Sequence, residues 1–320
     1  MLNAGASARR DNQFGRDAYS MSETRQPHSA EHFTNDRDHW WNADYLDLLQ
    51  QRYALQTCRR VLEFGAGIGH WTVLLRGLCA PDATFTLIER EPEWIAALER
   101  RFSDQPGIAA VCADVTDMPT FDAPFDLVTC QTLLMHIADV EEVLRAARRL
   151  LRPGGLLLVV EPNNLANRLQ ATPDSGLTPE EFGALAALWW AWEIGRTKRG
   201  FGREWIAEEL PRLIVRAGFT NLTASQNDKL FLRYPPYDTL DQTVVHGSLT
   251  EAIAAATELE PRTQVWDYCL AGGLDALGFE RGWAALEMLA RRTSDGLCAG
   301  SLSSAGLANF CVFGARAPFS

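Results

Sequence analysis

From about residue 38 onward, short continuous apolar runs alternate with stretches in which apolar residues recur every three or four positions. The first pattern predicts buried strands and the second predicts helices, so strands and helices should alternate along the chain. Short apolar runs, rich in Leu and β-branched residues and bounded by Gly, Pro or Asp, are typical of buried parallel strands. These runs cover residues 60–64, 84–88, 109–113, 125–130 and 155–160. An apolar stripe at helical spacing begins near Asp139 and ends before Pro153, which predicts a helix between the last two runs. Strand–helix repeats of this length favour an α/β protein with a Rossmann-like, doubly wound sheet.

The strand–helix alternation stops after Glu161. Thr178, Pro179 and Glu181 then provide an N-cap, a first-turn proline and a capping-box acid, which predict the start of a helix. Further along the chain we expect a helix over 203–217 and a strand over 221–225. Residues 227–305 should be mainly helical, with a capping box at Ser248 and Glu251, and a last strand should cover 308–315.

These patterns also predict the domain organisation. We expect a disordered tail over 1–30 and one domain over 31–320. Within that domain, the core comprises residues 56–161, 218–226 and 306–317, and helical insertions occupy 162–217 and 227–305.

The composition narrows the class of protein. The chain has 30 Lys and Arg residues against 41 Asp and Glu, a net charge of −11, whereas nucleic-acid and anionic-membrane surfaces need clustered cations. The longest uncharged apolar runs fall well short of the roughly 20 residues that a membrane span needs. The seven cysteines form no CxxC pair, which argues against a disulfide framework or a zinc site. We therefore expect a cytoplasmic protein with no nucleic-acid, membrane or metal partner.

The clearest motif is a strand that runs into Gly65, Gly67 and Gly69 and then into a helix. Glycines permit a tight turn and let the backbone approach a ligand closely, although they can also serve the turn alone. In dinucleotide folds the GxGxxG spacing places a pyrophosphate at the helix N-terminus, but here His70 holds the place of the third glycine. Glu63, two residues before the loop, can accept hydrogen bonds from an ammonium group. This combination favours a zwitterionic nucleoside over a diphosphate.

Two more acids follow at the ends of the next strands. Glu89 ends the second strand, where a carboxylate can accept hydrogen bonds from both hydroxyls of a ribose. Asp114 ends the third strand, where it can meet an adenine edge, with Val115 beside it. A helix N-cap role for Glu89 and a solvated loop position for Asp114 are the alternatives.

Two further motifs follow in order, Phe-Asp-Leu-Val at 125–128 and Leu-Leu-Arg-Pro-Gly-Gly at 150–155. With this whole series, residues 58–161 resemble the class I S-adenosylmethionine-dependent methyltransferases, near the bacterial group that acts on small molecules. The resemblance implies that S-adenosyl-L-methionine is the cofactor and that the loop holds its methionine part, Glu89 its ribose and Asp114 its adenine amino group. It also implies a seven-stranded sheet in which the last strand is antiparallel. The chain departs from that plan because about eighty residues separate the last two strands, for which an inserted helical cap is the simple explanation. The residues expected at the cofactor are Glu63, Gly65, Ala66, Gly67, Gly69, Glu89, Arg90, Asp114, Val115 and Gln131.

Methyl transfer needs alignment and exclusion of water, and orientation alone can supply ~7 kcal/mol or more. A general base is needed only where the acceptor is protonated. In this fold the acceptor meets the methyl group beyond the fourth strand, so His136 is the first candidate for a base. The alternatives are that His136 only bonds its own loop or that His70 is the base. Glu161, which ends the fifth strand, is the second catalytic candidate because it could pair with a cationic amine acceptor.

Aromatic residues supply the candidates for substrate binding. Trp40, Trp41 and Tyr45 precede the first strand, where an aromatic face can lie over the donor and attract a sulfonium by a cation–π contact. A helix that merely packs on the sheet is the alternative. Trp190 and Tyr237 lie in the insertions, which we expect to cover the carboxyl ends of the strands. A homodimer interface is the other use open to those insertions.

The sequence thus predicts transfer of a methyl group from S-adenosyl-L-methionine to an O or N atom of a small molecule, by in-line displacement in a capped pocket. Two alternatives remain open: the same donor site used for non-methyl chemistry, and a non-catalytic binding module on the same fold.

Overall fold

The computed structural model describes residues 37, 39–169, 176–243, 262–306 and 309–319. The predicted tail over 1–30 and the capping box predicted at Ser248 and Glu251 lie outside these residues. Among the described helices, none is both long enough and apolar enough to cross a bilayer.

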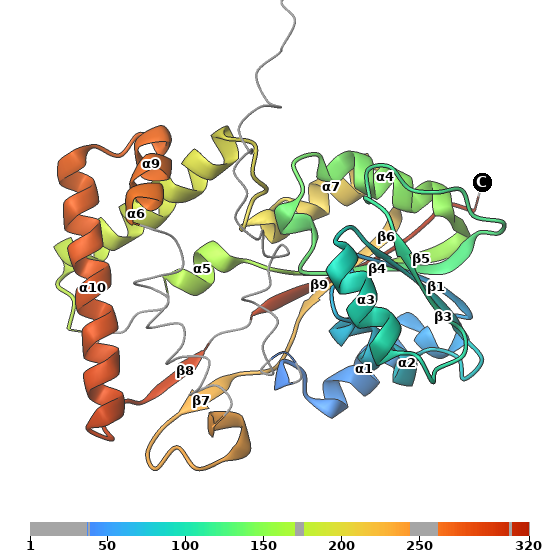
Figure 1. The fold of residues 1–320 in the computed structure, drawn as a ribbon, viewed down its shortest axis with the longest axis horizontal. Coiled ribbons are helices and arrows are strands. Elements are labelled where there is room, and N and C mark those ends of the chain that lie inside the picture. The colour runs from blue at the N-terminus through green and yellow to red at the C-terminus, as the bar shows by residue number, and fades with distance from the viewer. Residues whose placement is uncertain (1–36, 38, 170–175, 244–261, 307–308, 320) are drawn as a thin grey trace, which may run out of the picture.

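A seven-stranded sheet organises the chain (Figure 1). Strands β1 to β5 run parallel, and β9 is antiparallel to both of its neighbours, β5 and β6. In spatial order the strands are β3 (Ile108–Cys112), β2 (Thr84–Glu89), β1 (Arg60–Phe64), β4 (Phe125–Gln131), β5 (Leu151–Pro162), β9 (Phe310–Arg316) and β6 (Thr220–Gln226). This arrangement confirms the predicted Rossmann-like sheet with its last strand antiparallel. A separate two-stranded ribbon pairs β7 (Phe231–Arg233) with β8 (Ser304–Gly306).

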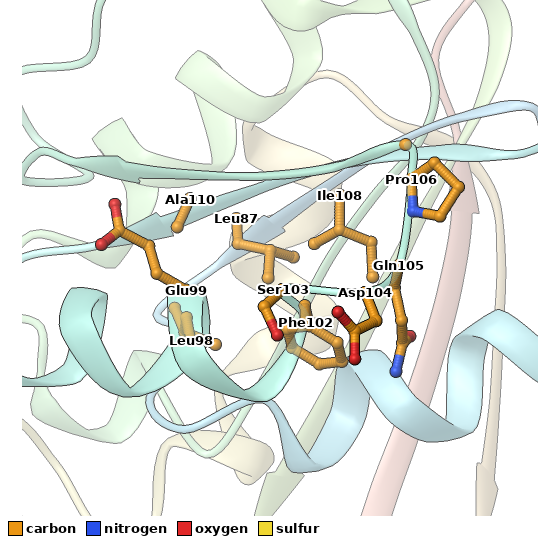
Figure 2. Close-up of a pocket in the computed structure, with 11 residues that line it drawn as sticks. Leu87, Leu98, Glu99, Phe102, Ser103, Asp104, Gln105, Pro106, Ile108 and Ala110 are labelled. Carbon is orange, nitrogen blue, oxygen red and sulfur yellow. The ribbon is translucent and has the colours of Figure 1, made fainter.

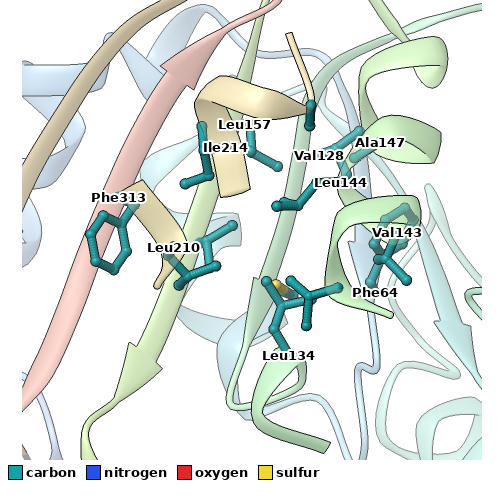
Figure 3. Packing of buried hydrophobic residues seen from close by; sticks show 14 of the residues in the cluster. Phe64, Val128, Leu134, Val143, Leu144, Ala147, Leu157, Leu210, Ile214 and Phe313 are labelled. Carbon is teal, nitrogen blue, oxygen red and sulfur yellow. The ribbon is translucent and has the colours of Figure 1, made fainter. Parts of the chain in front are cut away.

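Helices cover both faces of the sheet. On one face pack α1 (Ala43–Tyr53), α2 (His70–Leu78) and α3 (Pro92–Arg101). On the other face pack α4 (Val140–Leu150) and α7 (Leu210–Arg216), whose apolar side chains meet those of the strands in Figure 3. Both faces are buried, which explains why the parallel strands are continuous apolar runs.

Helix α4 shows how the local sequence sets an element. Asp139 is its N-cap and accepts a hydrogen bond from Glu142 N at 3.1 Å, and the apolar stripe that begins at Val140 is buried against the sheet. The helix ends at Leu150, and β5 begins at the next residue, so the turn at Pro153 and Gly154 lies within the early part of β5.

A helical lobe with its own apolar core is formed by α6 (Pro179–Lys198), α9 (Arg262–Gly272) and α10 (Ala276–Cys298). The predicted capping box at Thr178 starts α6. Close packing depends on glycine, because a Cβ at Gly195 would lie 1.8 Å from Tyr268 O and one at Gly272 would lie 1.8 Å from Ala191 O. The lobe lies beyond the carboxyl ends of the parallel strands, with α5 (Asn164–Arg168) between the two (Figure 1).

The stretch predicted as one helix over 203–217 differs in the structure. It contains a short 3-10 helix, η6 (Ile206–Glu208), and then α7. Glu209 separates the two, and Pro211 occupies the first turn of α7. Ile206, Leu210 and Ile214 are buried in the core of the sheet rather than in the lobe. This stretch is therefore the crossover from β5 to β6 and not part of an inserted cap. Helix α1 likewise packs on the sheet, although it precedes the predicted core.

Candidate active site

The glycine loop joins β1 to α2 in a left-handed conformation. Gly65, Gly67 and Gly69 have φ angles of +62°, +55° and +85°, which a residue with a Cβ adopts only with strain. Ala66 N donates to Ile88 O at 3.1 Å, so the loop is tied to the end of β2. The ends of β1 and β2 therefore form one rigid edge.

Glu63 lies under this loop and is 2% exposed. Thr72 Oγ1 in α2 donates to Glu63 Oε2 at 2.7 Å. Burial raises the pKa of the Glu63 carboxyl to about 8, the nearby Glu89 charge adds to the rise, and the Thr72 hydrogen bond opposes it. Glu63 is thus a mostly neutral acid at pH 7 that an ammonium group would ionise.

Glu89, at the end of β2, bonds to the loop itself. Its Oε2 accepts from Gly67 N at 2.9 Å, and its Oε1 accepts from Arg90 N at 2.7 Å and Glu91 N at 3.1 Å. A carboxylate offers about four acceptor sites, so roughly one is left for a hydroxyl. Glu89 therefore holds the shape of the loop in addition to any contact with a ribose.

Asp114 follows β3 and is half-buried. Burial favours a higher pKa for its carboxyl, but hydrogen bonds from the Thr116 backbone and hydroxyl and the charge of Arg90 outweigh it and lower the pKa. Both Thr116 bonds, of 2.8 and 2.7 Å, fall on Oδ1, which leaves Oδ2 for an amino group. The side chain of Val115 is buried in the sheet core behind Asp114. The Arg90 side chain is exposed and pairs with Glu91.

Glu161 is fully buried at the end of β5 and holds the loop after β4. Its Oε1 accepts from Leu133 N at 2.9 Å and Leu134 N at 2.6 Å, while its buried Oε2 has no hydrogen-bond partner among the described residues. Burial raises the pKa of Glu161 to about 8 against hydrogen bonds from the backbone of Leu134, Leu133 and Met135. The structure thus shows Glu161 as a support of this loop.

His136 is half-buried in the short 3-10 helix η4 (Leu134–His136), which this loop forms. The half-buried Gln131 begins the loop at the end of β4. A Cβ at Gly202 would lie 2.0 Å from Met135 O, so the connection from α6 back to the sheet rests directly on the loop. His70 is the first residue of α2, on the other side of the glycine loop. The geometry therefore brings His136 and Glu161 to the same loop.

The aromatic candidates separate into two groups. Trp41 and Tyr45 are 7% and 6% exposed and belong to the core under α1, with the Trp41 ring centroid 5.4 Å from that of Trp71. The Trp40 ring lies 4.7 Å from that of Phe310 at the start of β9. These rings lie at the carboxyl edge of the sheet.

The other two candidates lie elsewhere. Trp190 is 59% exposed on α6, and Tyr237 Oη donates to Leu302 O at 2.8 Å beside the ribbon of β7 and β8. Figure 1 places both elements away from the glycine loop. The structure therefore does not group Trp190 or Tyr237 with the predicted cofactor residues.

Sequence reasoning missed the polar side chains that link helix α2 to the strands below it. Trp71 Nε1 donates to Thr129 Oγ1 at 2.9 Å, and Thr129 is the register partner of Glu63 on the neighbouring strand. Together with the bond from Thr72 to Glu63, these contacts align the start of α2 over β1 and β4. The signal available was polar residues at buried positions directly after the glycine loop.

A cavity of about 490 Å³ lies under α3 at the edge of the sheet (Figure 2). It is lined by Leu87 and by residues of α3, β3 and the turn between them, and it includes none of the predicted site residues. This cavity is therefore separate from the edge that carries Glu63, Glu89 and Asp114.

Comparison with known proteins finds a match for the stretch of chain that carries this edge. Residues 62–159 match the family model described as a methyltransferase domain. This segment, about a third of the chain, is similar to that methyltransferase domain. The methyltransferase domain holds the glycine loop, both following acids and the loop of His136.

Relatives match over parts of their length. The chain is 30% identical over 131 residues to the ubiquinone/menaquinone biosynthesis C-methyltransferase UbiE of Pseudomonas savastanoi pv. phaseolicola, covering 38% of this chain and 51% of that protein. It is 30% identical over 102 residues to an uncharacterized 37.1 kDa protein in a transposon of Streptomyces fradiae, covering 32% of this chain and 30% of that protein. The chain thus spans about half or less of the length of these curated relatives.

Among solved structures, phosphoethanolamine N-methyltransferase 2 of Haemonchus contortus is similar to the chain, with a TM-score of 0.45 and 14% identity. The match covers 87% of this chain and 53% of that one.

The cofactor of this domain family is S-adenosylmethionine. The chemistry of the residues at the carboxyl edge fits it, because three of its polar parts find a suitable group there. Glu63 suits an ammonium, the remaining acceptor site of Glu89 suits a ribose hydroxyl, and Oδ2 of Asp114 suits an adenine amino group.

Proposed function

We propose that this protein is an S-adenosylmethionine-dependent methyltransferase that acts on an O or N atom of a small molecule. The observation that carries the proposal is a left-handed glycine loop bonded to Glu89, with Glu63 and Asp114 at the ends of the neighbouring strands, in the stretch that matches a methyltransferase domain. Open α/β sheets bind their ligands at this edge. The net charge of −11 supports a small acceptor rather than a nucleic acid.

S-adenosylmethionine, when bound, supplies a methyl group already activated on a sulfonium. The protein then has to bind, orient and exclude water. Glu63 holds the ammonium of the methionine part, Glu89 a ribose hydroxyl and Asp114 the adenine amino group. Ala66, Gly67, Arg90 and Gln131 complete the cofactor surface.

The acceptor is held at the loop that follows β4. Glu161 fixes the backbone of Leu133 and Leu134, and this fixes the position of η4, which carries His136. His136 is the group that takes the proton of a protonated acceptor. Because Glu161 is fully buried, we assign it to positioning of this loop and not to direct contact with the acceptor.

The decisive experiment is equilibrium binding of S-adenosylhomocysteine by calorimetry, together with mass spectrometry of ligands that remain bound to the purified protein. We expect affinity for S-adenosylhomocysteine, whereas a bound nicotinamide cofactor or no affinity would refute the proposal. A labelled methyl donor with a metabolite extract then identifies the acceptor. The screen should include carbon nucleophiles, because a matched relative is named as a C-methyltransferase. Donor binding without any methyl transfer would favour non-methyl chemistry or a binding module.

A further inference from the structure

The segment that precedes and begins α1 is held by residues far away in the sequence. Asn227, directly after β6, is 7% exposed, and its side chain bonds in two directions. Its Oδ1 accepts from Phe310 N at 2.9 Å and its Nδ2 donates to Trp40 O at 3.3 Å. Its backbone N also donates to Phe310 O at 3.0 Å. One amide group thus joins the end of β6, the start of β9 and the aromatic segment.

Asp228 and Asp241, which follow Asn227 in the chain, form further contacts with the segment that precedes α1. Asn42 Nδ2 donates to Asp228 Oδ1 at 3.1 Å. Lys229 Nζ lies 2.6 Å from Asp241 Oδ2, and Asp241 Oδ1 lies 3.0 Å from His39 Nδ1. The hydrogen bond from Lys229 lowers the pKa of the Asp241 carboxyl, with a smaller contribution from His39, and this outweighs its slight burial. We call Asn227, Asp228, Lys229 and Asp241 the latch.

All four latch residues belong to the insertion between β6 and β9. In a sheet of this plan those two strands could be joined by a short hairpin, because they are antiparallel neighbours. Instead the chain leaves β6 at Asn227, and the first residues of the insertion reach the aromatic segment. The insertion therefore has a contact with the methyltransferase domain that is independent of the helical lobe.

The segment that the latch holds carries an unsatisfied donor. Trp41 is 7% exposed, and its indole N–H has no hydrogen-bond acceptor among the described residues. Its ring adjoins that of Trp71, whose own N–H is bonded to Thr129 beside Glu63. A buried donor without an acceptor is uncommon in folded proteins, and a bound ligand is one way to supply the acceptor.

We propose that Asn227 is a positioning residue that fixes residues 40–45 over the carboxyl edge, so that the Trp41 indole N–H meets a carboxylate of the bound donor. The donor part of this inference rests on the proposed function. An amino-acid part held through its ammonium at Glu63 brings a carboxylate to the same edge, where a buried N–H donor is the group that it needs. The inserted residues thus tune donor affinity in this chain.

Asn227→Asp tests the latch, because the new carboxylate keeps an acceptor for Phe310 N but cannot donate to Trp40 O. Hydrogen exchange of the ligand-free protein should rise several-fold at residues 40–45, as the segment opens locally more often. Affinity for S-adenosylhomocysteine should fall about tenfold, the size expected for one lost buried hydrogen bond. Trp41→Phe should weaken binding by a similar factor while exchange at 40–45 stays at the wild-type rate.

Gln50→Ala is the matched control. It removes a bond of 2.9 Å from Gln50 Nε2 to Leu78 O on the same helix α1, at the end of α2 and away from the latch. The affinity of Gln50→Ala for S-adenosylhomocysteine should remain within about twofold of wild type, because the lost hydrogen bond is only partly buried and lies away from the site. Asp241→Asn provides a second latch variant if Asn227→Asp folds poorly.

The outcomes test the latch, the role of residues 40–45 in donor binding and the proposed function separately. Wild-type exchange at 40–45 in both latch variants would overturn the latch. Raised exchange with unchanged affinity for S-adenosylhomocysteine would overturn the role of the segment in donor binding. If the wild-type protein binds no S-adenosylhomocysteine but Asn227→Asp still raises exchange, the proposed function fails while the latch is supported.

Discussion

Glu63 and Thr129 face the same side of neighbouring strands, and both are bonded by the first turn of α2. This pairing buries a carboxyl whose pKa is raised to about 8, so that a bound cation would favour its ionised form. A glycine loop alone would not distinguish a zwitterionic ligand from other nucleosides. A buried acid that ionises when an ammonium binds would do so, and the proton that it releases can be measured.

Binding of S-adenosylhomocysteine should release about one proton per site at pH 7. The pKa of Glu63 is raised to about 8 in the ligand-free protein, so the carboxyl starts mostly protonated, and a bound ammonium lowers its pKa and ionises it. Affinity should accordingly increase as the pH rises from 6 to 7. Calorimetry in two buffers of different ionisation enthalpy measures the release.

Glu63→Gln should abolish this proton release and weaken binding. Thr57→Ala, a change at an exposed position before β1, should preserve it. Wild-type binding with no proton exchanged at pH 7 would show that no ammonium reaches Glu63.

Glu89→Ala should reduce both stability and donor affinity. Three backbone N–H groups lose their acceptor, and a buried group left unsatisfied costs about 1–3 kcal/mol, so we expect a loss of unfolding free energy of about that size. Donor binding should weaken by about 1–3 kcal/mol through loss of the hydroxyl contact. Thermal unfolding and calorimetry with S-adenosylhomocysteine measure the two effects.

The exposed Glu93, at the start of α3, offers a control as Glu93→Ala, for which donor affinity should stay unchanged. A folded Glu89→Ala protein with normal affinity would remove Glu89 from the donor site.

At the scale of elements, α5, α6 and the connection back to the sheet are joined by buried charges. Arg168 lies 2.9 Å from Glu193 and 2.6 Å from Glu204, and Arg196 lies 2.5 Å from Glu204. The guanidinium of Arg168 also lies 4.5 Å from the ring of Trp192. This cluster fixes the helical lobe to the segment that leaves β5.

The two acids of this cluster should respond differently to neutral substitution. Burial raises the pKa of Glu193 to about 7 and the charge of Glu204 adds to it, whereas the two arginines lower the pKa of Glu204 despite its burial. Glu204 therefore carries the charge that balances the arginines. Glu204→Gln should cost about 3–5 kcal/mol of unfolding free energy, as for a broken buried pair, and Glu193→Gln about 1 kcal/mol or less.

The pH dependence gives a second readout. A raised pKa favours the protonated acid in the folded state, so Glu193 lowers stability as the pH rises from about 4.5 through 7. Glu193→Gln should remove that part of the decline when urea unfolding is compared at pH 6 and pH 8. Equal losses for the two substitutions at both pH values would contradict this division of charge.

The sequence allowed most elements of the sheet to be predicted, because their signals are local. The run at 60–64 and the N-cap at Asp139 define β1 and α4 without reference to the rest of the chain. The prediction of one helix over 203–217 was less accurate. A proline such as Pro211 is tolerated in the first turn of a helix, but the sequence alone does not show that a new helix begins there.

Contacts between distant residues could not be predicted in this way. Trp40 and Asn227 are separated by 187 positions, and no spacing rule connects them. The approach of Gly195 to Tyr268 likewise depends on how two helices meet. The same limit explains the site: the acids and glycines follow local motifs, whereas the buried support from Thr72 and the exposed position of Trp190 depend on tertiary packing.

In the whole molecule, the sheet and the helical lobe meet at the loop that carries His136. Glu161 supports this loop from the sheet side through Leu133 and Leu134, and the connection from α6 touches its other side at Gly202. If His136 is the proposed base, support on both sides would keep it within the narrow geometry that methyl transfer requires. The position of the lobe is therefore coupled to the loop of His136 by a close backbone contact at Gly202.

Gly202→Ala should disturb this contact. A Cβ at Gly202 would lie 2.0 Å from Met135 O and 2.6 Å from the carbonyl carbon of His136, and both are backbone atoms that cannot rotate away. We expect a loss of about 1–3 kcal/mol of unfolding free energy, as for other overpacked sites, and faster hydrogen exchange over residues 133–137. Gly183→Ala is the control, because a Cβ there meets nothing within 4 Å and alanine is the better helix former by up to about 1 kcal/mol. Affinity for S-adenosylhomocysteine should change little in Gly202→Ala, since the glycine loop and its acids lie on other strands. If Gly202→Ala is as stable as wild type and residues 133–137 exchange at the wild-type rate, the connection does not constrain this loop. The position of the lobe is then not coupled to the loop of His136.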